Sequence, residues 1–168
     1  LAVAFLENGW SLKWLHREIL MSQAYRQAST ISDAAVKKDP DNHWLSRMPL
    51  RRLSAESVRD SLLDVAGQLD TRAFGPPDDV KVRNDGLVTS VRGERGWRRT
   101  IFVRQRRKEV LTILENFDLP QMQPNCVSRP SSTVAPQALH LLNNALVREL
   151  ADHFANRVWD DAGAEPKE

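Results

Sequence analysis

The residues best suited to bind an anion lie between positions 129 and 137. Arg129 precedes a run of hydroxyl side chains that ends with Ser132 and Thr133, and Gln137 follows in the first turn of an expected helix. Backbone N–H groups at a helix N-terminus, together with a guanidinium, can bind a phosphate, sulfate or carboxylate. The same residue types are also good helix caps, so capping is the alternative interpretation of this run.

A basic stripe comes earlier in the chain. Residues 92–108 hold seven Arg and one Lys against Glu94 alone, whereas residues 109–168 hold four basic and nine acidic residues. Such a stripe can bind acidic ligands, or it can pair with the acidic C-terminal third of the same chain. We do not expect nucleic-acid binding, because only Trp97 and Phe102 supply aromatic faces for stacking bases.

Carboxylates could supply acid–base catalysis at two places. Asp118 follows an expected helix and could be a general acid or base, or it could cap a turn. Glu56, Asp60 and Asp64 are four residues apart, so they share one helical face and would suit hydrolysis or a hard metal ion. Arg59 lies on the same stretch, which favours a solvated face of salt bridges instead. The sequence therefore assigns no catalytic residue.

Thiol and metal chemistry have little support. The single cysteine, Cys126, excludes an internal disulfide framework and an all-cysteine metal site. We expect a small buried side chain there, with a functional thiol near Arg129 as the alternative. The four His lack ligand spacing, and the Cys-x-x-Cys-His haem motif, the His-Glu-x-x-His motif and a Gly-rich phosphate loop are missing from the sequence. We therefore expect no metal and no cofactor in this chain.

The composition is that of a globular domain. The 168 residues carry a formal net charge of +2 and are 41% hydrophobic, which is enough to bury a core. No stretch approaches the roughly 20 apolar residues of a membrane helix. Because the apolar run at residues 1–6 resembles the end of a helix, we expect the chain to be a fragment of a longer protein.

Helices must position most of these residues. Ser11 and Ser54 are good N-caps, and either Thr133 or Ala135 could cap the last helix. The spacing of apolar residues predicts helices over residues 12–27, 54–69, 109–117 and 134–159.

The middle of the chain has strand signals. The turn Asn84-Asp85-Gly86 predicts a hairpin, and residues 100–103 are expected to add a strand. The predicted fold class is mainly α: an orthogonal or irregular bundle of about four to five helices, with a small β-hairpin or three-stranded element near residues 80–104. We expect one helical domain over residues 1–159 and a loose acidic tail over residues 160–168.

An ordered set of short motifs runs along residues 1–158. Those of the first half include Asn8-Gly9-Trp10-Ser11, Asp39-Pro40-Asp41-Asn42 and Glu56-x-x-Arg59-Asp60. Those of the second half are Arg98-Arg99-Thr100-Ile101-Phe102-Val103, Arg106-Arg107, Phe117-Asp118-Leu119-Pro120, Cys126-x-x-Arg129 and Thr133-x-x-Pro136-Gln137-Ala138-Leu139-x-x-Leu142-Asn143. Together they resemble the C-terminal domain of unknown function in planctomycete cytochrome C domain-containing proteins.

The resemblance implies an extracytoplasmic (periplasmic or cell-surface) protein whose upstream part can carry a c-type haem. It also implies involvement with complex polysaccharides, but it carries over no activity. The family commonly has a Thr-Asn-Thr-Pro-like run where this chain has Ser132-Thr133-Val134-Ala135-Pro136, which weakens the idea of a catalytic signature there.

We therefore expect a non-catalytic helical module that packs on or orients the upstream domains of the same polypeptide. The alternative is a domain that binds or acts on acidic, sulfated or carboxylated polysaccharides. Convergence of the candidate residues on a concave pocket would favour binding, and their pairing as structural ties would favour the module. The candidate ligand-binding residues are Arg106, Arg107, Asp118, Arg129, Ser132, Thr133, Gln137 and Asn143.

Overall fold

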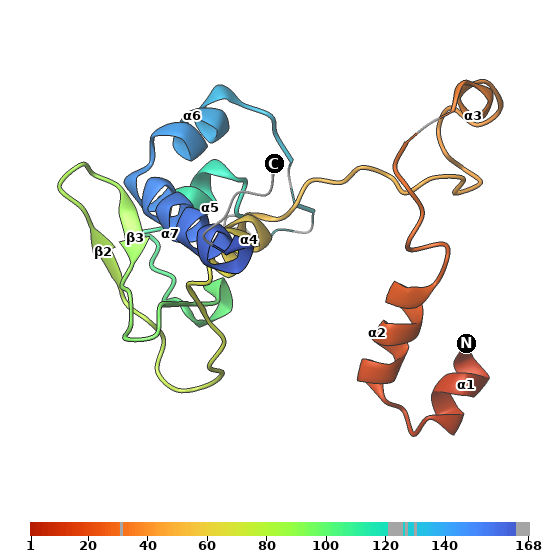
Figure 1. Ribbon diagram of the computed structural model, residues 1–168, viewed down its shortest axis with the longest axis horizontal. Coiled ribbons are helices and arrows are strands. Elements are labelled where there is room, and N and C mark those ends of the chain that lie inside the picture. Colours follow the sequence, from red (N-terminus) through yellow and green to blue (C-terminus); the bar gives the residue numbers. More distant parts are fainter. Residues whose placement is uncertain (31, 121–125, 127, 130, 164–168) are drawn as a thin grey trace. The chain divides into compact units, whose positions relative to one another are not determined.

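The computed structural model describes all residues except 31, 121–125, 127, 130 and 164–168 (Figure 1). The chain divides into two compact units, Leu1–Arg51 and Arg52–Glu168. The predicted mainly α class is confirmed for the described part of the chain.

The first unit contains three short helices, α1 (Ala2–Glu7), α2 (Leu12–Met21) and α3 (Asp33–Lys38). Ser11 caps α2 as predicted, since its hydroxyl accepts from the backbone N–H of Trp14 at 3.3 Å. Helix α2 ends at Met21, earlier than expected, because the Ser22 hydroxyl donates to the carbonyl of Ile19 and accepts from the N–H of Tyr25. A serine that bonds the backbone in this way competes with helix continuation.

Apolar side chains do not hold the first unit together. Of its described residues only Asp39 is buried, and its carboxylate accepts from the backbone N–H groups of His43 at 2.7 Å and Trp44 at 2.8 Å. The rings of Phe5 and Trp10 meet edge to face at 5.5 Å, but Trp10 is still 67% exposed. This unit is therefore ordered by local polar contacts rather than by a core of its own.

The second unit combines helices with two small sheets. Its α-helices are α4 (Ala55–Val65), α5 (Thr112–Asn116), α6 (Ala135–Asn143) and α7 (Ala145–Ala162). Strands β2 (Val80–Val82) and β3 (Val88–Ser90) form the predicted antiparallel hairpin, and β1 (Leu69–Asp70) pairs in parallel with β4 (Trp97–Arg98).

Two predicted elements are wrong. Residues Thr100–Phe102 form a 3-10 helix, η1, because Asp60 of α4 binds both the backbone N–H and the hydroxyl of Thr100. The helix expected over residues 134–159 is two helices, because Asn144 leaves helical geometry (ψ 129°) and caps α7 with its side chain. The N-cap position of α6 is Val134, neither Thr133 nor Ala135.

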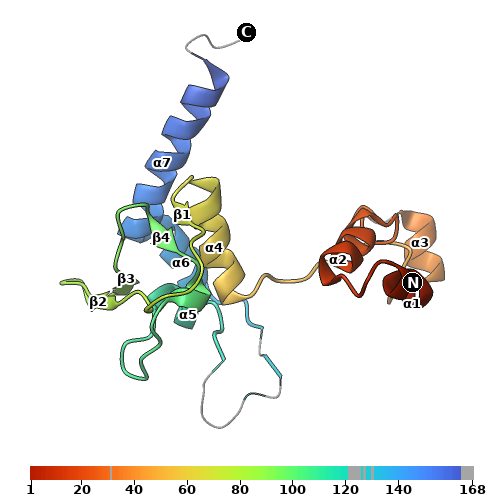
Figure 2. The same ribbon diagram turned by 90° about the horizontal axis from the view of Figure 1, so that it is seen from below.

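Helix α4 lies between two hydrophobic clusters and joins them. One cluster contains Ala55 of α4 together with Val103, Leu111 and Leu114. The other contains Leu63, Ala66, Trp97 and Leu150, which come from α4, β4 and α7. Figure 2 shows α4 beside β1 and β4, with α7 extending beyond the rest of this unit.

Candidate functional site

Four of the eight candidate residues meet in one hydrogen-bonded network. The carboxylate of Asp118 accepts from the backbone N–H of Ser132 at 2.6 Å and from its hydroxyl at 2.8 Å. Gln137, which is 5% exposed, accepts from Arg52 at 3.0 Å and donates to the carbonyl of Ser132 at 3.3 Å. Arg52 also donates to the hydroxyl of Thr133 at 2.5 Å. The network ties Asp118, two residues beyond the end of α5, to the segment that enters α6.

The hydrogen bonds of this network are structural rather than catalytic. The N–H and hydroxyl of Ser132 hold the pKa of Asp118 below its usual range, so Asp118 is an anion at neutral pH. A general acid would need the opposite shift. The side chain of Gln137 also accepts from the backbone N–H of Val134 at 3.4 Å, which is a capping contact at the start of α6.

Arg129 forms an ion pair outside this network. Its Nη1 lies 3.0 Å and 2.9 Å from the two carboxylate oxygens of Glu56 on α4. Partial burial raises the pKa of Glu56, but the hydrogen bonds from Arg129, from Ser54 and from its own backbone N–H, together with the charge of Arg129, outweigh burial and the net pKa is lowered. The same contacts raise the pKa of Arg129. Glu56 therefore already occupies part of this guanidinium's hydrogen-bonding capacity.

The remaining candidates do not join the network either. Arg106 donates to Glu109 at 2.7 Å and to Asp79 at 3.2 Å, and these contacts raise its pKa. Arg107 is exposed and makes no ion pair among the described residues. Asn143 is exposed, whereas its neighbour Asn144 is buried. The eight residues do not share one concave pocket, and ligand binding by them stays a prediction.

The sequence interpretation missed the most buried charged residue, Arg59. Its guanidinium is 3% exposed and donates to the carbonyl of Arg98 at 3.0 Å, the hydroxyl of Thr100 at 3.1 Å and the hydroxyl of Ser90 at 2.8 Å. Burial lowers the pKa of Arg59, and the neighbouring carboxylate of Asp60, 3.3 Å away, opposes this shift. The expected salt bridges do form at Glu56 and Asp60, but Arg59 is buried rather than solvated, because it joins α4 to β3, β4 and η1.

A second buried guanidinium, that of Arg98, organises the loop before the hairpin. It donates to the carbonyls of Phe74 and Pro76 at 2.9 Å and to the carboxylate of Asp78 at 3.2 Å. It also lies 4.6 Å from the centre of the Phe102 ring, which is cation–π distance. Arg98, an arginine of the basic stripe, therefore stabilises the fold.

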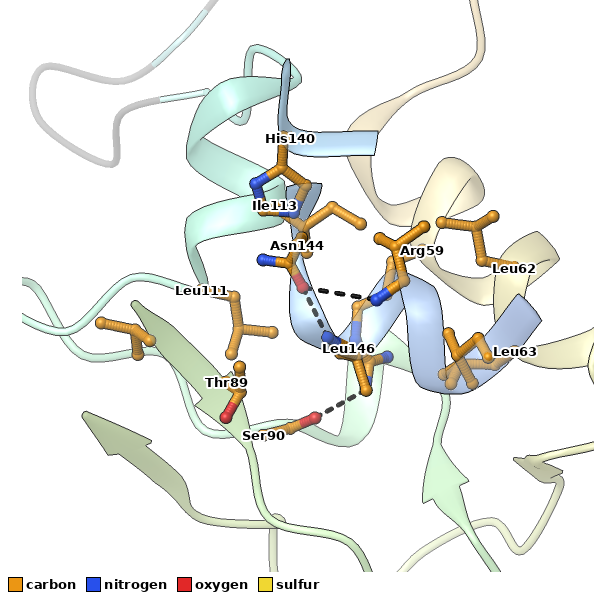
Figure 3. Close-up of a pocket in the computed structure, with 13 residues that line it drawn as sticks. Arg59, Leu62, Leu63, Thr89, Ser90, Leu111, Ile113, His140, Asn144 and Leu146 are labelled. Carbon is orange, nitrogen blue, oxygen red and sulfur yellow. Dashed lines mark hydrogen bonds between the residues drawn. The ribbon is translucent and has the colours of Figure 1, made fainter. Parts of the chain in front are cut away.

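A cavity lies where α4, α6 and α7 meet the hairpin (Figure 3). Apolar side chains such as Leu63 and Leu111 form most of its wall, and its polar side chains are Arg59, Thr89, Ser90, His140 and Asn144. The space inside it measures about 20 Å³, which is room for roughly one water molecule. The cavity is therefore a packing feature and is too small for a substrate.

We expect protonation of His140 to destabilise the fold. Burial lowers its pKa below 6.5, its Nδ1 lies 3.0 Å from the amide nitrogen of Asn116, and the Arg59 guanidinium lines the same cavity. The unfolded chain then binds the proton more tightly, so stability from this residue is complete above pH 6.5 and is lost as the pH falls below it. Urea unfolding between pH 7.5 and 5 measures this effect. His140→Gln should flatten the profile, and an unchanged profile would contradict the prediction.

The prediction of a buried thiol is wrong. Cys126 is exposed rather than buried, and its thiol donates to the carbonyl of Ser128 at 2.9 Å. Among the described residues, no cluster of three or more His, Cys, Asp or Glu side chains could hold a metal ion. None of the described helices combines the length and apolar character that a membrane crossing requires.

Comparison with known proteins gives one match. Neither the curated proteins nor the solved structures contain a match to the chain. The family model described as "PSD1: Protein of unknown function (DUF1553)" matches residues 1–167. This domain occurs in planctomycete cytochrome c-domain proteins, which confirms the resemblance carried by the ordered motifs. The chain therefore belongs to the PSD1 family of proteins of unknown function.

Proposed function

We propose that this chain is a non-catalytic docking module within a larger exported, cytochrome c-associated protein. In this proposal the second unit is a rigid scaffold, and the first unit packs on a domain that precedes it in the same polypeptide. The setting is extracytoplasmic, and any c-type haem is carried by the upstream part. Occurrence of the family in cytochrome c-domain proteins supports the presence of such neighbouring domains.

The observation that carries the proposal is the lack of a core in the first unit. None of its described apolar side chains is buried, and the exposed ones include Trp10, Leu12, Met21 and Trp44, at 63–75% exposure. About 50 residues that bury no apolar side chain gain little hydrophobic free energy to offset their loss of conformational entropy. Large exposed apolar side chains gathered in one small unit are typical of an interaction surface.

The second unit supports the non-catalytic part of the proposal. The side chains that could have formed a site are engaged in structural contacts. Asp118 binds Ser132, and Arg129 binds Glu56. Arg59 is buried, and its guanidinium contacts four polar groups. A catalytic carboxylate or guanidinium needs free hydrogen-bonding capacity directed at a substrate. Asp118 and Arg59 therefore direct their hydrogen bonds inside the fold, and Arg129 uses one of its nitrogens there.

Hydrogen–deuterium exchange tests the docking role. The chain is compared with a longer polypeptide that includes the preceding domains. We expect the backbone amides of α1 and α2 to exchange quickly in the chain alone and at least about tenfold more slowly in the longer polypeptide, because docking shields them. Equal exchange of residues 2–21 in the two proteins would contradict the proposal.

A matched pair of substitutions tests which face of α2 is used. Leu12 is 63% exposed and Lys13 is the next residue of the same helix. Leu12→Ser in the longer polypeptide should restore fast exchange of α2, whereas Lys13→Ser should not. Protection that survives Leu12→Ser together with Ile19→Ser would contradict docking through this face, because Leu12 and Ile19, which is 41% exposed, are seven residues apart and share one side of α2.

A further inference from the structure

We propose that the second unit binds an oxyanion in a hollow between the β2–β3 hairpin and α7. This site is separate from the eight candidate residues, and it does not rest on the docking role. The side chains that line it include Lys81, Arg83, Thr89, Arg92, Trp97 and Glu149.

The charge of the hollow is the first argument. Three cationic side chains face one carboxylate, Glu149, so the hollow has a net positive charge. Among the described residues, neither Lys81 nor Arg92 forms an ion pair, and Arg83 is paired with Asp85 at 3.2 Å. The cationic side chains of the hollow therefore outnumber the carboxylates that could neutralise them, and the excess positive charge attracts anions.

The positions of the donors are the second argument. The register of the hairpin sets Lys81 directly opposite Thr89, so the ammonium and the hydroxyl lie on the same face of the sheet. Arg92 lies over the Trp97 ring at 5.2 Å and donates to the side chain of Gln68 at 2.9 Å. Because Trp97 is only 5% exposed, it is a fixed support for this guanidinium.

These contacts leave Arg92 able to bind a ligand. A guanidinium has five N–H donors, and the only acceptor that the described residues give Arg92 is the neutral oxygen of Gln68. A pre-positioned guanidinium loses less side-chain entropy when it binds, and it can form two parallel hydrogen bonds to one oxyanion. The ligand class is therefore a sulfate, phosphate or carboxylate group, held by Arg92 and Lys81 with the Thr89 hydroxyl nearby.

Titration at constant ionic strength tests the site. Sodium sulfate, inorganic phosphate and a sulfated monosaccharide are each exchanged for chloride, and the indole N–H signals are followed by NMR. We expect saturable shifts of the Trp97 signal. Arg92→Ala and Lys81→Ala should each weaken binding about threefold to fivefold, and Glu149→Gln should strengthen it about threefold. Tighter binding of the sulfated sugar than of sulfate would identify the anion as a group on a larger ligand, and equal binding would identify a free anion.

Arg107→Ala is the matched control. Arg107 carries the same charge on an exposed position and does not line the hollow. It should leave the affinity unchanged. Shifts that do not saturate, or equal weakening by Arg92→Ala and Arg107→Ala, would overturn the proposal in favour of non-specific charge attraction. An unchanged affinity of Glu149→Gln would also overturn the proposal, because this variant alters an exposed side chain and leaves the cationic residues in place.

Discussion

Arg59→Met is expected to lower the free energy of unfolding by about 3–4 kcal/mol. The substitution keeps an unbranched chain of similar length but removes every donor of the buried guanidinium. Ser90, Thr100 and the carbonyl of Arg98 would each lose a hydrogen-bond donor in a place that solvent does not reach. The carboxylate of Asp60 would lose a cation 3.3 Å away. For a domain of this size, that loss lowers the melting temperature by roughly 10 °C.

Arg129→Met makes the same chemical change at an exposed ion pair. The Arg129 side chain is 57% exposed and its partner Glu56 is 29% exposed, so water screens the pair. We expect a cost below about 1 kcal/mol. Thermal and urea unfolding of both variants measure the difference. Equal stability losses would contradict the assignment of Arg59 as the main polar tie of the second unit.

Gly96→Ala should destabilise the protein by about 3 kcal/mol or more. Gly96 has a φ of 115°, and a Cβ at this position would overlap the carbonyl of Gln68. That carbonyl accepts from the N–H of Trp97 at 3.0 Å, where β1 and β4 meet. The strands would have to separate, and Trp97 of the second hydrophobic cluster would move with them.

Gly86→Ala separates backbone strain from overlap. Gly86 has a φ of 82° in the hairpin turn, and a Cβ there would meet no atom within 4 Å. The variant should lose only about 1 kcal/mol, which is the cost of a left-handed backbone for a residue with a side chain. A Gly96→Ala variant as stable as Gly86→Ala would show that the Gln68 carbonyl yields easily, contrary to the prediction.

The predictions that the structure confirms rest on short-range chemistry, although the cap expected at Thr133 or Ala135 lies at Val134. Ser11 and Ser54 cap helices as expected, because a hydroxyl needs only an N–H three residues away. The turn at Asn84-Asp85-Gly86 closes the hairpin for a similar reason, since Gly86 supplies the positive φ. Asn144 gave the same kind of local signal, but the continuous apolar stripe on both sides of it concealed the break between α6 and α7.

Predictions that depend on partners distant in sequence failed for α4. The helix predicted over residues 54–69 from the spacing of its apolar residues ends at Val65, and its buried residues are Ala55, Arg59 and Leu63, which are four apart. Arg59 thus occupies the middle of the buried face, four residues from the apolar Ala55 and Leu63, and this spacing was the signal that the sequence offered. A charged residue can be buried there only because acceptors from β3, β4 and η1 surround it, and periodicity alone does not show them.

The sequence by itself determined the helical class, the caps at Ser11 and Ser54, the hairpin and the family, because propensity, capping and motif order are properties of neighbouring residues. Only the tertiary structure decided which charged side chains form hydrogen bonds or ion pairs within the fold and which remain available to bind a ligand. Arg129 and Glu56 are 73 residues apart in sequence, and Arg52 and Gln137 are 85 apart, yet each pair is in contact. The electrostatic role of a charged residue depends on its burial and on neighbours that folding brings within a few ångströms. The arginines of the basic stripe therefore have three different roles. Arg98 is buried and binds backbone carbonyls, and Arg106 forms ion pairs. Arg92 lines a hollow that the sequence did not reveal.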